Sequence, residues 1–181
     1  MQPTLHYAPG LLLKAQDISI AFFDVDGVLT DGGLYFSSEG ETWKRFHALD
    51  GHGLKLLQAA GIVPAVITGR DSTALRARLQ ALGITHAHFA VQDKRVAAQA
   101  TLSALGLQWG QAAVMGDDWP DLALMDRCAF SAAPPNAHAE VLAAADYVSA
   151  RRGGDGAARE FCDLLLVACG KYAGLLAEAR S

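Results

Sequence analysis

The sequence has 181 residues, enough for one domain with a sizeable core and too few for two of ordinary size, so we predict a single domain over 1–181. Its 51% hydrophobic and 19% charged residues exclude a disordered chain. The formal net charge of −4 offers no broad positive surface, so we expect no nucleic-acid partner and no anionic membrane partner. An anionic substrate would have to be held by a few cations or by a metal ion.

The three cysteines indicate the compartment. Cys128, Cys162 and Cys169 form no C-x-x-C pair, and an odd number cannot close into a complete set of intramolecular disulfides. No basic segment precedes an apolar run near the N-terminus, and no apolar run approaches ~20 residues. We therefore expect a cytoplasmic protein that is not inserted into a membrane.

Short apolar runs alternate with amphipathic stretches along the chain. The runs predict five strands, at 18–23, 62–67, 86–90, 112–115 and 146–149. The stretches predict helices at 54–60, 72–82, 94–105, 136–145 and 157–169, with Ser72 as a cap and Gly83 as a stop. This alternation predicts an α/β fold: a doubly wound, Rossmann-like parallel sheet with helices on both faces.

Residues 34–46 depart from that alternation. Period-two character on both sides of Ser38-Glu39-Gly40 predicts a β-hairpin inserted after the first strand, over about residues 32–47. The insertion carries four aromatic residues, Tyr35, Phe36, Trp43 and Phe46. Such density on a hairpin indicates that one face is covered, either by the domain itself or by another subunit.

Polar side chains gather where the predicted strands end. In an open α/β sheet, ligands bind at the carboxyl ends of the strands. The first strand runs into 24–31 (Asp-Val-Asp-Gly-Val-Leu-Thr-Asp), the second into Thr68-Gly69-Arg70, and the fourth into 116–121 (Gly-Asp-Asp-Trp-Pro-Asp). Lys94 opens the helix after the third strand.

Two carboxylates follow the first strand two residues apart. While the backbone stays extended, Asp24 and Asp26 point to the same side, and each raises the pKa of the other unless a cation lies between them. A second acidic cluster follows the fourth strand. Together the clusters indicate a hard divalent cation with oxygen ligands, and Mg²⁺ is the usual choice beside phosphate. Thr68 and Lys94 could offset the charge of a phosphoryl group that these acids would repel.

With these residues the chain resembles the phosphohydrolases of the haloacid dehalogenase superfamily. The superfamily's four motifs match Asp24-x-Asp26-Gly27-x-x-Thr30, Thr68 in Ile-Thr-Gly-Arg, Lys94, and Gly116-Asp117-Asp118-x-x-Asp121. Within the superfamily, residues 17–171 are similar to capless phosphatases of 3-deoxy-D-manno-octulosonate 8-phosphate, an intermediate in lipopolysaccharide synthesis. This closer likeness depends on Thr30-Asp31-Gly32, the hairpin, Phe46-His47, residues 50–53, Arg78 and residues 153–160.

The resemblance implies a covalent mechanism. Asp24 would be the nucleophile that takes the phosphoryl group as an aspartyl-phosphate. Asp26 would protonate the leaving sugar oxygen and later activate water. Thr68 and Lys94 would hold the phosphoryl oxygens in the transition state.

It also implies a metal site. Mg²⁺ would bind the carboxylates of Asp24 and Asp117 and the backbone carbonyl of Asp26. Asp118 and Asp121 would support these ligands or the lysine.

Without a cap domain, the resemblance implies that a homotetramer closes the site, with the hairpins around its axis and a neighbour completing each pocket. A sugar acid's carboxylate and hydroxyls would be bound by residues from the following set: His47, Asp50, Gly51, Lys55, Arg70 and Arg78. The chain departs from the family at Leu49, where an arginine is usual. That loss of a cation bears on which sugar acid is the substrate.

Two alternatives remain at this stage. A phosphatase of another sugar acid, such as a nine-carbon sialic-acid-type 9-phosphate, would use the same catalytic residues. A phospho-accepting receiver domain of signalling proteins also combines acids, Mg²⁺, Thr and Lys on a doubly wound sheet. Receivers place the phospho-acceptor after the third strand, whereas here the candidate nucleophile follows the first.

Overall fold

A central sheet of six parallel strands organises the computed structural model, which describes residues 4–181. The strand order is β5-β4-β1-β6-β7-β8, and a separate two-stranded sheet pairs β2 with β3 in antiparallel. The strands are β1 (Ile20–Phe23), β2 (Tyr35–Ser37), β3 (Gly40–Trp43), β4 (Val63–Ile67), β5 (His86–His88), β6 (Ala112–Met115), β7 (Phe130–Ala133) and β8 (Tyr147–Val148). The doubly wound parallel sheet expected from the sequence is confirmed.

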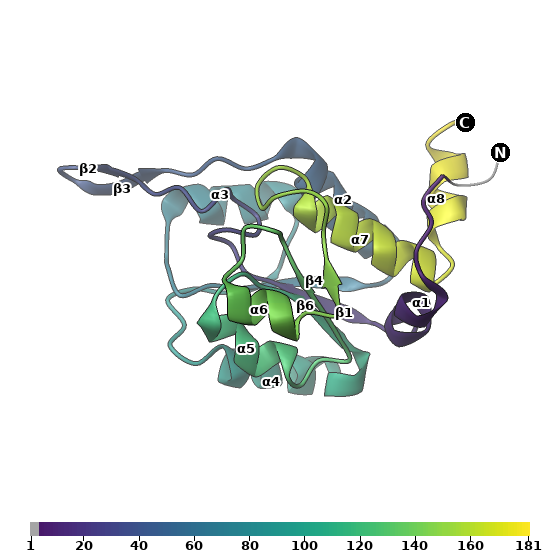
Figure 1. Cartoon of the computed structure of the whole chain (residues 1–181). Helices are drawn as coiled ribbons and strands as arrows, with labels where there is room; N and C mark the ends of the chain where they lie inside the picture. Colours follow the sequence, from purple (N-terminus) through teal and green to yellow (C-terminus); the bar gives the residue numbers. More distant parts are fainter. Residues whose placement is uncertain (1–3) are drawn as a thin grey trace.

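Helices cover both faces of this sheet. They are α1 (Pro9–Ala15), α2 (Ala48–Ala59), α3 (Thr73–Leu82), α4 (Lys94–Leu105), α5 (Trp119–Met125), α6 (Ala139–Ala144), α7 (Ala157–Ala168) and α8 (Tyr172–Glu178), with a short 3-10 turn η1 (Trp109–Gln111). Figure 1 shows α2, α3 and α7 on one face and α4, α5 and α6 on the other. None of the helices formed by residues 4–181 is long and apolar enough to cross a membrane.

The central strand β1 divides the core into two halves. Its residues are all buried, as expected for a strand covered on both faces. Ala21 and Phe23 face the half that contains Phe161, and the Phe23 and Phe161 rings meet edge to face with centroids 5.5 Å apart. Ile20 and Phe22 face the other half. This alternation fixes the register of β1, so Asp24 emerges between β4 and β6 at the carboxyl end of the sheet.

The sequence analysis missed β7 and also α5, which carries Asp121 of the site. β7 reads Phe-Ser-Ala-Ala and lacks the β-branched residues that usually mark a strand. α5 begins Trp-Pro-Asp, which resembles a loop, yet proline is tolerated in the first turn of a helix because no partner for its N–H is needed there. α1, η1 and α8 also lie outside the predicted elements.

Four predicted boundaries were wrong by two residues or more. β1 begins at Ile20 and not at 18. α2 begins at Ala48, six residues before the expected start at 54, because the His47 side chain caps it by accepting the Leu49 N–H. α6 begins at Ala139 and not at 136, since residues 135–137 form a turn. β5 ends at His88 and not at 90, where Ala90 has a positive φ of 52°. The predicted cap Ser72 and the stop Gly83 of α3 are observed.

The predicted hairpin is present, with its turn at residues 38–39. Every residue of β2 is exposed, and the hairpin projects from the body on the side away from α1 and α8 (Figure 1). Phe36 is 63% exposed and Trp43 is 75% exposed. The described part of the chain's own domain therefore does not cover the aromatic face of the hairpin.

Candidate active site

A pocket of about 390 Å³ opens at the carboxyl ends of β1, β4 and β6. Loops after these strands, together with the start of α4, bring eight of the predicted site residues to its wall. They are Asp24, Asp26, Thr68, Arg70, Lys94, Asp117, Asp118 and Asp121. The structure thus gathers the residues of all four sequence motifs in one place.

The loop after β1 is held by a buried hydroxyl. Thr30 is 1% exposed, and its Oγ1 donates to the Val25 carbonyl at 3.2 Å and accepts the N–H groups of Gly27 and Gly32. Gly27 has a φ of +99°, and a Cβ there would lie 1.9 Å from Oδ2 of Asp117. Glycine is therefore required at this position for the loop after β6 to approach the loop after β1.

Lys94 places a buried positive charge between two carboxylates. It is the first residue of α4, which Asp93 caps by accepting the N–H groups of Arg95 and Val96. Its ammonium group donates to Oδ1 of Asp24, and to Oδ1 of Asp121 at 2.7 Å. Asp24, Lys94 and Asp121 are 8%, 7% and 2% exposed, so this charge pairing takes place out of bulk water.

One lysine does not compensate all the acids around it. Burial raises the pKa of Asp24 to about 7, against the lowering effect of Lys94. Burial, followed by the negative charge of Asp24, raises the pKa of Asp117 to about 8. One carboxylate oxygen from each of Asp24, Asp117 and Asp121 lies within 4.8 Å of the others. Clustered oxygens that resist ionisation without a further cation are the donor set that a hard divalent ion prefers.

The start of α5 fixes the second acidic cluster. Oδ2 of Asp121 accepts the N–H groups of Asp117 at 3.1 Å and of Asp118 at 3.4 Å. Asp118 in turn caps α5 by accepting the Trp119 N–H at 2.9 Å. Asp121 therefore orients the Asp117 loop and also pairs with Lys94, while Asp118 is exposed at the rim of the pocket.

Asp26 has a cationic partner that the sequence did not indicate. The ammonium group of Lys44, at the end of the hairpin, donates to Oδ1 of Asp26 and lies 2.9 Å from Oε1 of Glu41. Arg70 approaches both acids, with Nε 3.8 Å from Oδ2 of Asp26 and Nη1 3.7 Å from Oε2 of Glu41. Because Asp26 and Lys44 are 18 positions apart and no motif spacing links them, only the folded hairpin reveals this contact.

The predicted substrate residue Asp50 makes structural contacts in the described subunit. It is 2% exposed, and its two carboxylate oxygens accept the N–H groups of Gly156 at 3.3 Å and Arg159 at 2.8 Å. These bonds join the start of α2 to the start of α7. Its neighbour Gly51 is also buried, and a Cβ there would lie 2.1 Å from Nη2 of Arg78.

The remaining predicted substrate residues do not reach the catalytic pocket within this chain. Nη2 of Arg78 donates to the His47 carbonyl at 3.4 Å, and its guanidinium lies 6.0 Å from the centre of the Phe46 ring. Lys55 is exposed on α2. Of the three predicted substrate cations, only Arg70 lines the pocket around Asp24.

Leu49, the position of the family's usual arginine, is 53% exposed. It lines a different hollow, beside Asp155 and Arg159, and not the pocket around Asp24. In the described subunit the side chain at this position therefore does not line the pocket of its own catalytic residues.

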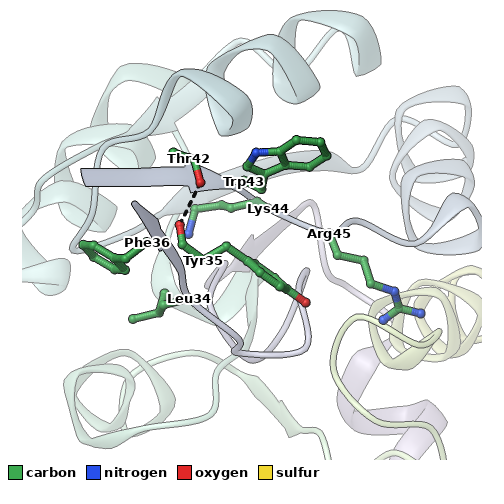
Figure 2. Close-up of a pocket in the computed structure, with 7 residues that line it drawn as sticks. All are labelled: Leu34, Tyr35, Phe36, Thr42, Trp43, Lys44 and Arg45. Carbon is green, nitrogen blue, oxygen red and sulfur yellow. Dashed lines mark hydrogen bonds between the residues drawn. The ribbon is translucent and has the colours of Figure 1, made fainter. Parts of the chain in front are cut away.

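A further hollow, of about 720 Å³, lies along the hairpin and is lined by Leu34, Tyr35, Phe36, Thr42, Trp43, Lys44 and Arg45. Figure 2 shows the rings of Tyr35, Phe36 and Trp43 spread in different directions from the two strands, which are joined by a bond from the Thr42 hydroxyl to the Tyr35 carbonyl. Arg45 points away from these rings (Figure 2), and its Nη2 lies 2.7 Å from Oδ1 of Asp155, in the loop before α7. The hairpin base is thus anchored while its aromatic side chains remain exposed.

Comparison with known proteins agrees with this geometry. Residues 90–161 match the family model described as haloacid dehalogenase-like hydrolase. The fold and the pocket therefore define a haloacid dehalogenase-type hydrolase without a cap domain.

Individual relatives show which haloacid dehalogenase-like hydrolases this chain is similar to. The chain is 40% identical over 167 residues to the 3-deoxy-D-manno-octulosonate 8-phosphate phosphatase KdsC of Yersinia pestis, covering 92% of this chain and 89% of the relative. The chain superposes on the corresponding phosphatase of Moraxella catarrhalis with a TM-score of 0.91 and 37% identity, over 95% of this chain and 99% of that one. That structure was solved with magnesium, phosphate and 3-deoxy-D-manno-octulosonate (KDO). The cobalt-bound enzyme of Haemophilus influenzae gives 41% identity and a TM-score of 0.86, over 88% and 94%.

The chain belongs to the family of 3-deoxy-D-manno-octulosonate 8-phosphate phosphatases and is a phosphoric monoester hydrolase. The receiver-domain alternative is therefore wrong.

Proposed function

We propose that this enzyme releases phosphate from 3-deoxy-D-manno-octulosonate 8-phosphate, with Mg²⁺ as cofactor and an aspartyl-phosphate on Asp24 as intermediate. The observation that carries the proposal is the buried arrangement of Asp24, Lys94 and Asp121 beside Asp26 and Thr68 in one pocket. The relatives add support, because one of them was solved with magnesium, phosphate and the dephosphorylated sugar acid.

The carboxylates fit a magnesium ion. Asp24 and Asp117 would bind it, together with the backbone carbonyl of Asp26, while Asp118 and Asp121 hold the loop that carries Asp117. Asp24 and Asp117 are crowded and buried, so the pKa values of these two carboxyl groups lie well above the usual range until a cation joins them. When bound, Mg²⁺ supplies positive charge that offsets the repulsion between these carboxylates and an incoming phosphate.

In the first step a carboxylate oxygen of Asp24 attacks phosphorus. The bond from phosphorus to the sugar oxygen breaks, and its electron pair stays on that oxygen. The Asp26 carboxyl group gives its proton to this oxygen, so the sugar leaves as an alcohol. The Lys94 ammonium and the Thr68 hydroxyl bind the phosphoryl oxygens as charge spreads over them.

In the second step water attacks the same phosphorus. The Asp26 carboxylate takes a proton from this water, and the bond from phosphorus to Asp24 breaks. Inorganic phosphate leaves, and Asp24 returns to a carboxylate. Asp26 regains the proton it lost in the first step, so one carboxyl group serves both steps.

Arg70 is the cation we assign to the acidic end of the sugar. It is half exposed at the mouth of the pocket, its side chain being 47% accessible, and it lies close to Asp26. His47, Asp50, Gly51, Lys55 and Arg78 stay as a proposal for the neighbouring subunit's contribution, since none of them lines this subunit's catalytic pocket.

We further propose that the enzyme is a homotetramer. Each subunit leaves Tyr35, Phe36 and Trp43 exposed on a projecting hairpin, and apolar aromatic surface of this kind favours burial against another copy. A neighbour seated there would also narrow a pocket that has no cap. The three cysteines are free thiols, which is typical of the reducing cytoplasm where we place the enzyme.

A panel of phosphorylated sugars tests the proposal. We expect Mg²⁺-dependent phosphate release that is fastest with 3-deoxy-D-manno-octulosonate 8-phosphate. Faster release from a nine-carbon sialic-acid-type 9-phosphate would favour that alternative and leave the catalytic residues unchanged. Equal rates with neutral sugar phosphates would overturn the assignment of a sugar acid.

A further inference from the structure

Four charged side chains of alternating sign form a closed ring that includes Asp26, the proposed acid and base. Lys44 contacts Asp26 and Glu41, and Arg70 approaches the same two carboxylates at 3.8 and 3.7 Å. The ring joins three parts of the chain: the loop after β1, the loop after β4 and the hairpin. Two positive and two negative charges balance, so the ring holds no net charge.

Lys44 is the most enclosed member of this ring. Its side chain is 1% exposed, compared with 19% for Asp26, 13% for Glu41 and 47% for Arg70. Burying an ammonium group is costly unless carboxylates surround it, and two do so here. The position is thus specific to a cation that is paired on both sides.

Lys44 reaches Asp26 from outside the catalytic pocket. Asp26 lines the pocket that also contains Asp24 and Thr68, whereas Lys44 lines the hollow along the hairpin. Figure 2 shows the Lys44 side chain pointing to the opposite side from the side chain of its neighbour Arg45. One oxygen of Asp26, Oδ1, is engaged by this ammonium group, so the rotation of the carboxyl group is fixed.

We propose that Lys44 is a positioning residue that aims the Asp26 carboxyl group at the leaving sugar oxygen, and that Glu41 holds Lys44 in place for this task. The inference rests on the proposed function, because it assigns Lys44 a part in the proton transfer from Asp26. It also gives the hairpin a second task, since Lys44 directly follows the exposed Trp43, the last residue of β3.

The contribution of Lys44 differs from that of Lys94. Lys94 contacts Asp24, the proposed nucleophile, and would matter for every phosphate ester. Lys44 acts through Asp26, so its effect on the first step depends on how much the leaving group needs a proton. A sugar alkoxide is a poor leaving group and needs one, while p-nitrophenolate leaves readily without it.

The experiment compares the first turnover of 3-deoxy-D-manno-octulosonate 8-phosphate with that of p-nitrophenyl phosphate. Wild type and Lys44→Met are mixed in excess over substrate with Mg²⁺, and the released sugar or p-nitrophenolate is followed by rapid quench. A displaced acid can cost a large part of the ~10²–10⁴-fold that acid catalysis contributes, so we expect sugar release to slow by about 10-fold or more. We expect p-nitrophenolate release to change by less than about 2-fold, because that step draws little on Asp26.

Two controls separate positioning from general disruption. Lys14→Met removes another lysine paired with an aspartate, half exposed on α1 and not among the residues that line the catalytic pocket, and should leave both rates unchanged. In an Asp26→Asn background, Lys44→Met should add no further loss of sugar release, since the group that it positions is already absent. A merely structural role would add its own loss there.

Equal slowing with both esters, no slowing with either, or a full additional loss in the Asp26→Asn background would each overturn the inference. If Lys44→Met does not fold, the double variant Glu41→Leu with Lys44→Met removes one charge of each sign and tests the same expectation. Wild type that releases phosphate from neither ester would instead overturn the proposed function, and the inference with it.

Discussion

The Lys94 ammonium group at the start of α4 donates to the carboxylate of Asp24, the residue that directly follows β1. The two residues are 70 positions apart, and both are nearly buried. Parallel strands end at one edge of the sheet, so this contact follows from the topology and not from local sequence. It keeps a cation beside the oxygen that we propose to attack phosphorus.

The stability of the metal-free chain should depend on Lys94. Removing one partner of a buried ion pair leaves the other charge without compensation, which costs about 3–5 kcal/mol. We expect Lys94→Met to lower the free energy of unfolding by about this much, measured by urea denaturation with a chelator present. Lys14→Met, which removes an exposed pair, should cost less than about 1 kcal/mol. Equal losses in the two variants would contradict the assignment.

The metal-free chain should be less stable in alkaline than in mildly acidic solution. In the fold, the pKa of Asp24 is raised to about 7 and that of Asp117 to about 8, from 3.8 for a free side chain. Above a pH of about 4 the folded chain therefore keeps protons that the unfolded chain has lost, so stability falls as pH rises through 7 and 8. We expect a higher Tm at about pH 6 than at about pH 8.5 with a chelator present, and a smaller difference in Asp117→Asn.

Magnesium binding should show the opposite trend. The ion needs deprotonated carboxylates, so its affinity should rise from about pH 6 to about pH 8 and binding should release protons. Calorimetry in two buffers of different ionisation enthalpy measures this release directly. Affinity that does not change over this range would mean that Asp24 and Asp117 do not bind the ion.

The hairpin should control assembly. Trp43→Glu places a charge on the most exposed aromatic of the hairpin, and we expect it to shift the mass measured by light scattering from four chains toward one. Glu39→Lys, a charge change at the hairpin turn, is the matched control and should remain a tetramer. A wild-type mass of one chain with full activity would contradict the proposal that a neighbour completes the pocket.

Substrate discrimination should depend on Arg70 more than on Arg78. Arg70 lines the catalytic pocket, while Arg78 is engaged with the His47 carbonyl and the Phe46 ring. A charge-assisted contact contributes about 1.5–3 kcal/mol, so Arg70→Ala should reduce the preference in kcat/KM for an acidic over a neutral sugar phosphate by roughly 10–150-fold. A larger loss in Arg78→Ala would place the carboxylate beside α3 of a neighbour.

Sequence reasoning predicted the sheet and the catalytic pocket because both depend on local patterns. Buried strands followed by Asp, Thr or Gly-Asp segments identify the carboxyl edge without any knowledge of long-range contacts, and Lys94 is recognisable as the first residue of a capped helix. Asp50 could not be interpreted in this way. Its partners, the N–H groups of Gly156 and Arg159, lie more than 100 positions away, and only the packing of α2 on α7 brings them together.

Lys44, in contrast, was not predicted as a site residue, although it contacts Asp26. Within the hairpin it reads as an ordinary solvated lysine of a strand, and nothing in its neighbours indicates burial. The end of the hairpin lies beside the loop after β1, so the Lys44 side chain is enclosed by Asp26 and Glu41. A register fixed by the turn decides this, and turn geometry is not encoded in hydrophobic periodicity.

The central claim is that Asp24 carries the phosphoryl group during hydrolysis of a sugar-acid phosphate. The most direct measurement is phosphate release from 3-deoxy-D-manno-octulosonate 8-phosphate by wild type and Asp24→Asn, with and without Mg²⁺, alongside a Tm for each protein. We predict release by wild type only with Mg²⁺, and no detectable release by a folded Asp24→Asn, which lacks the nucleophilic oxygen but loses little volume. Near-normal release by that variant, or by wild type without a divalent cation, would contradict the account.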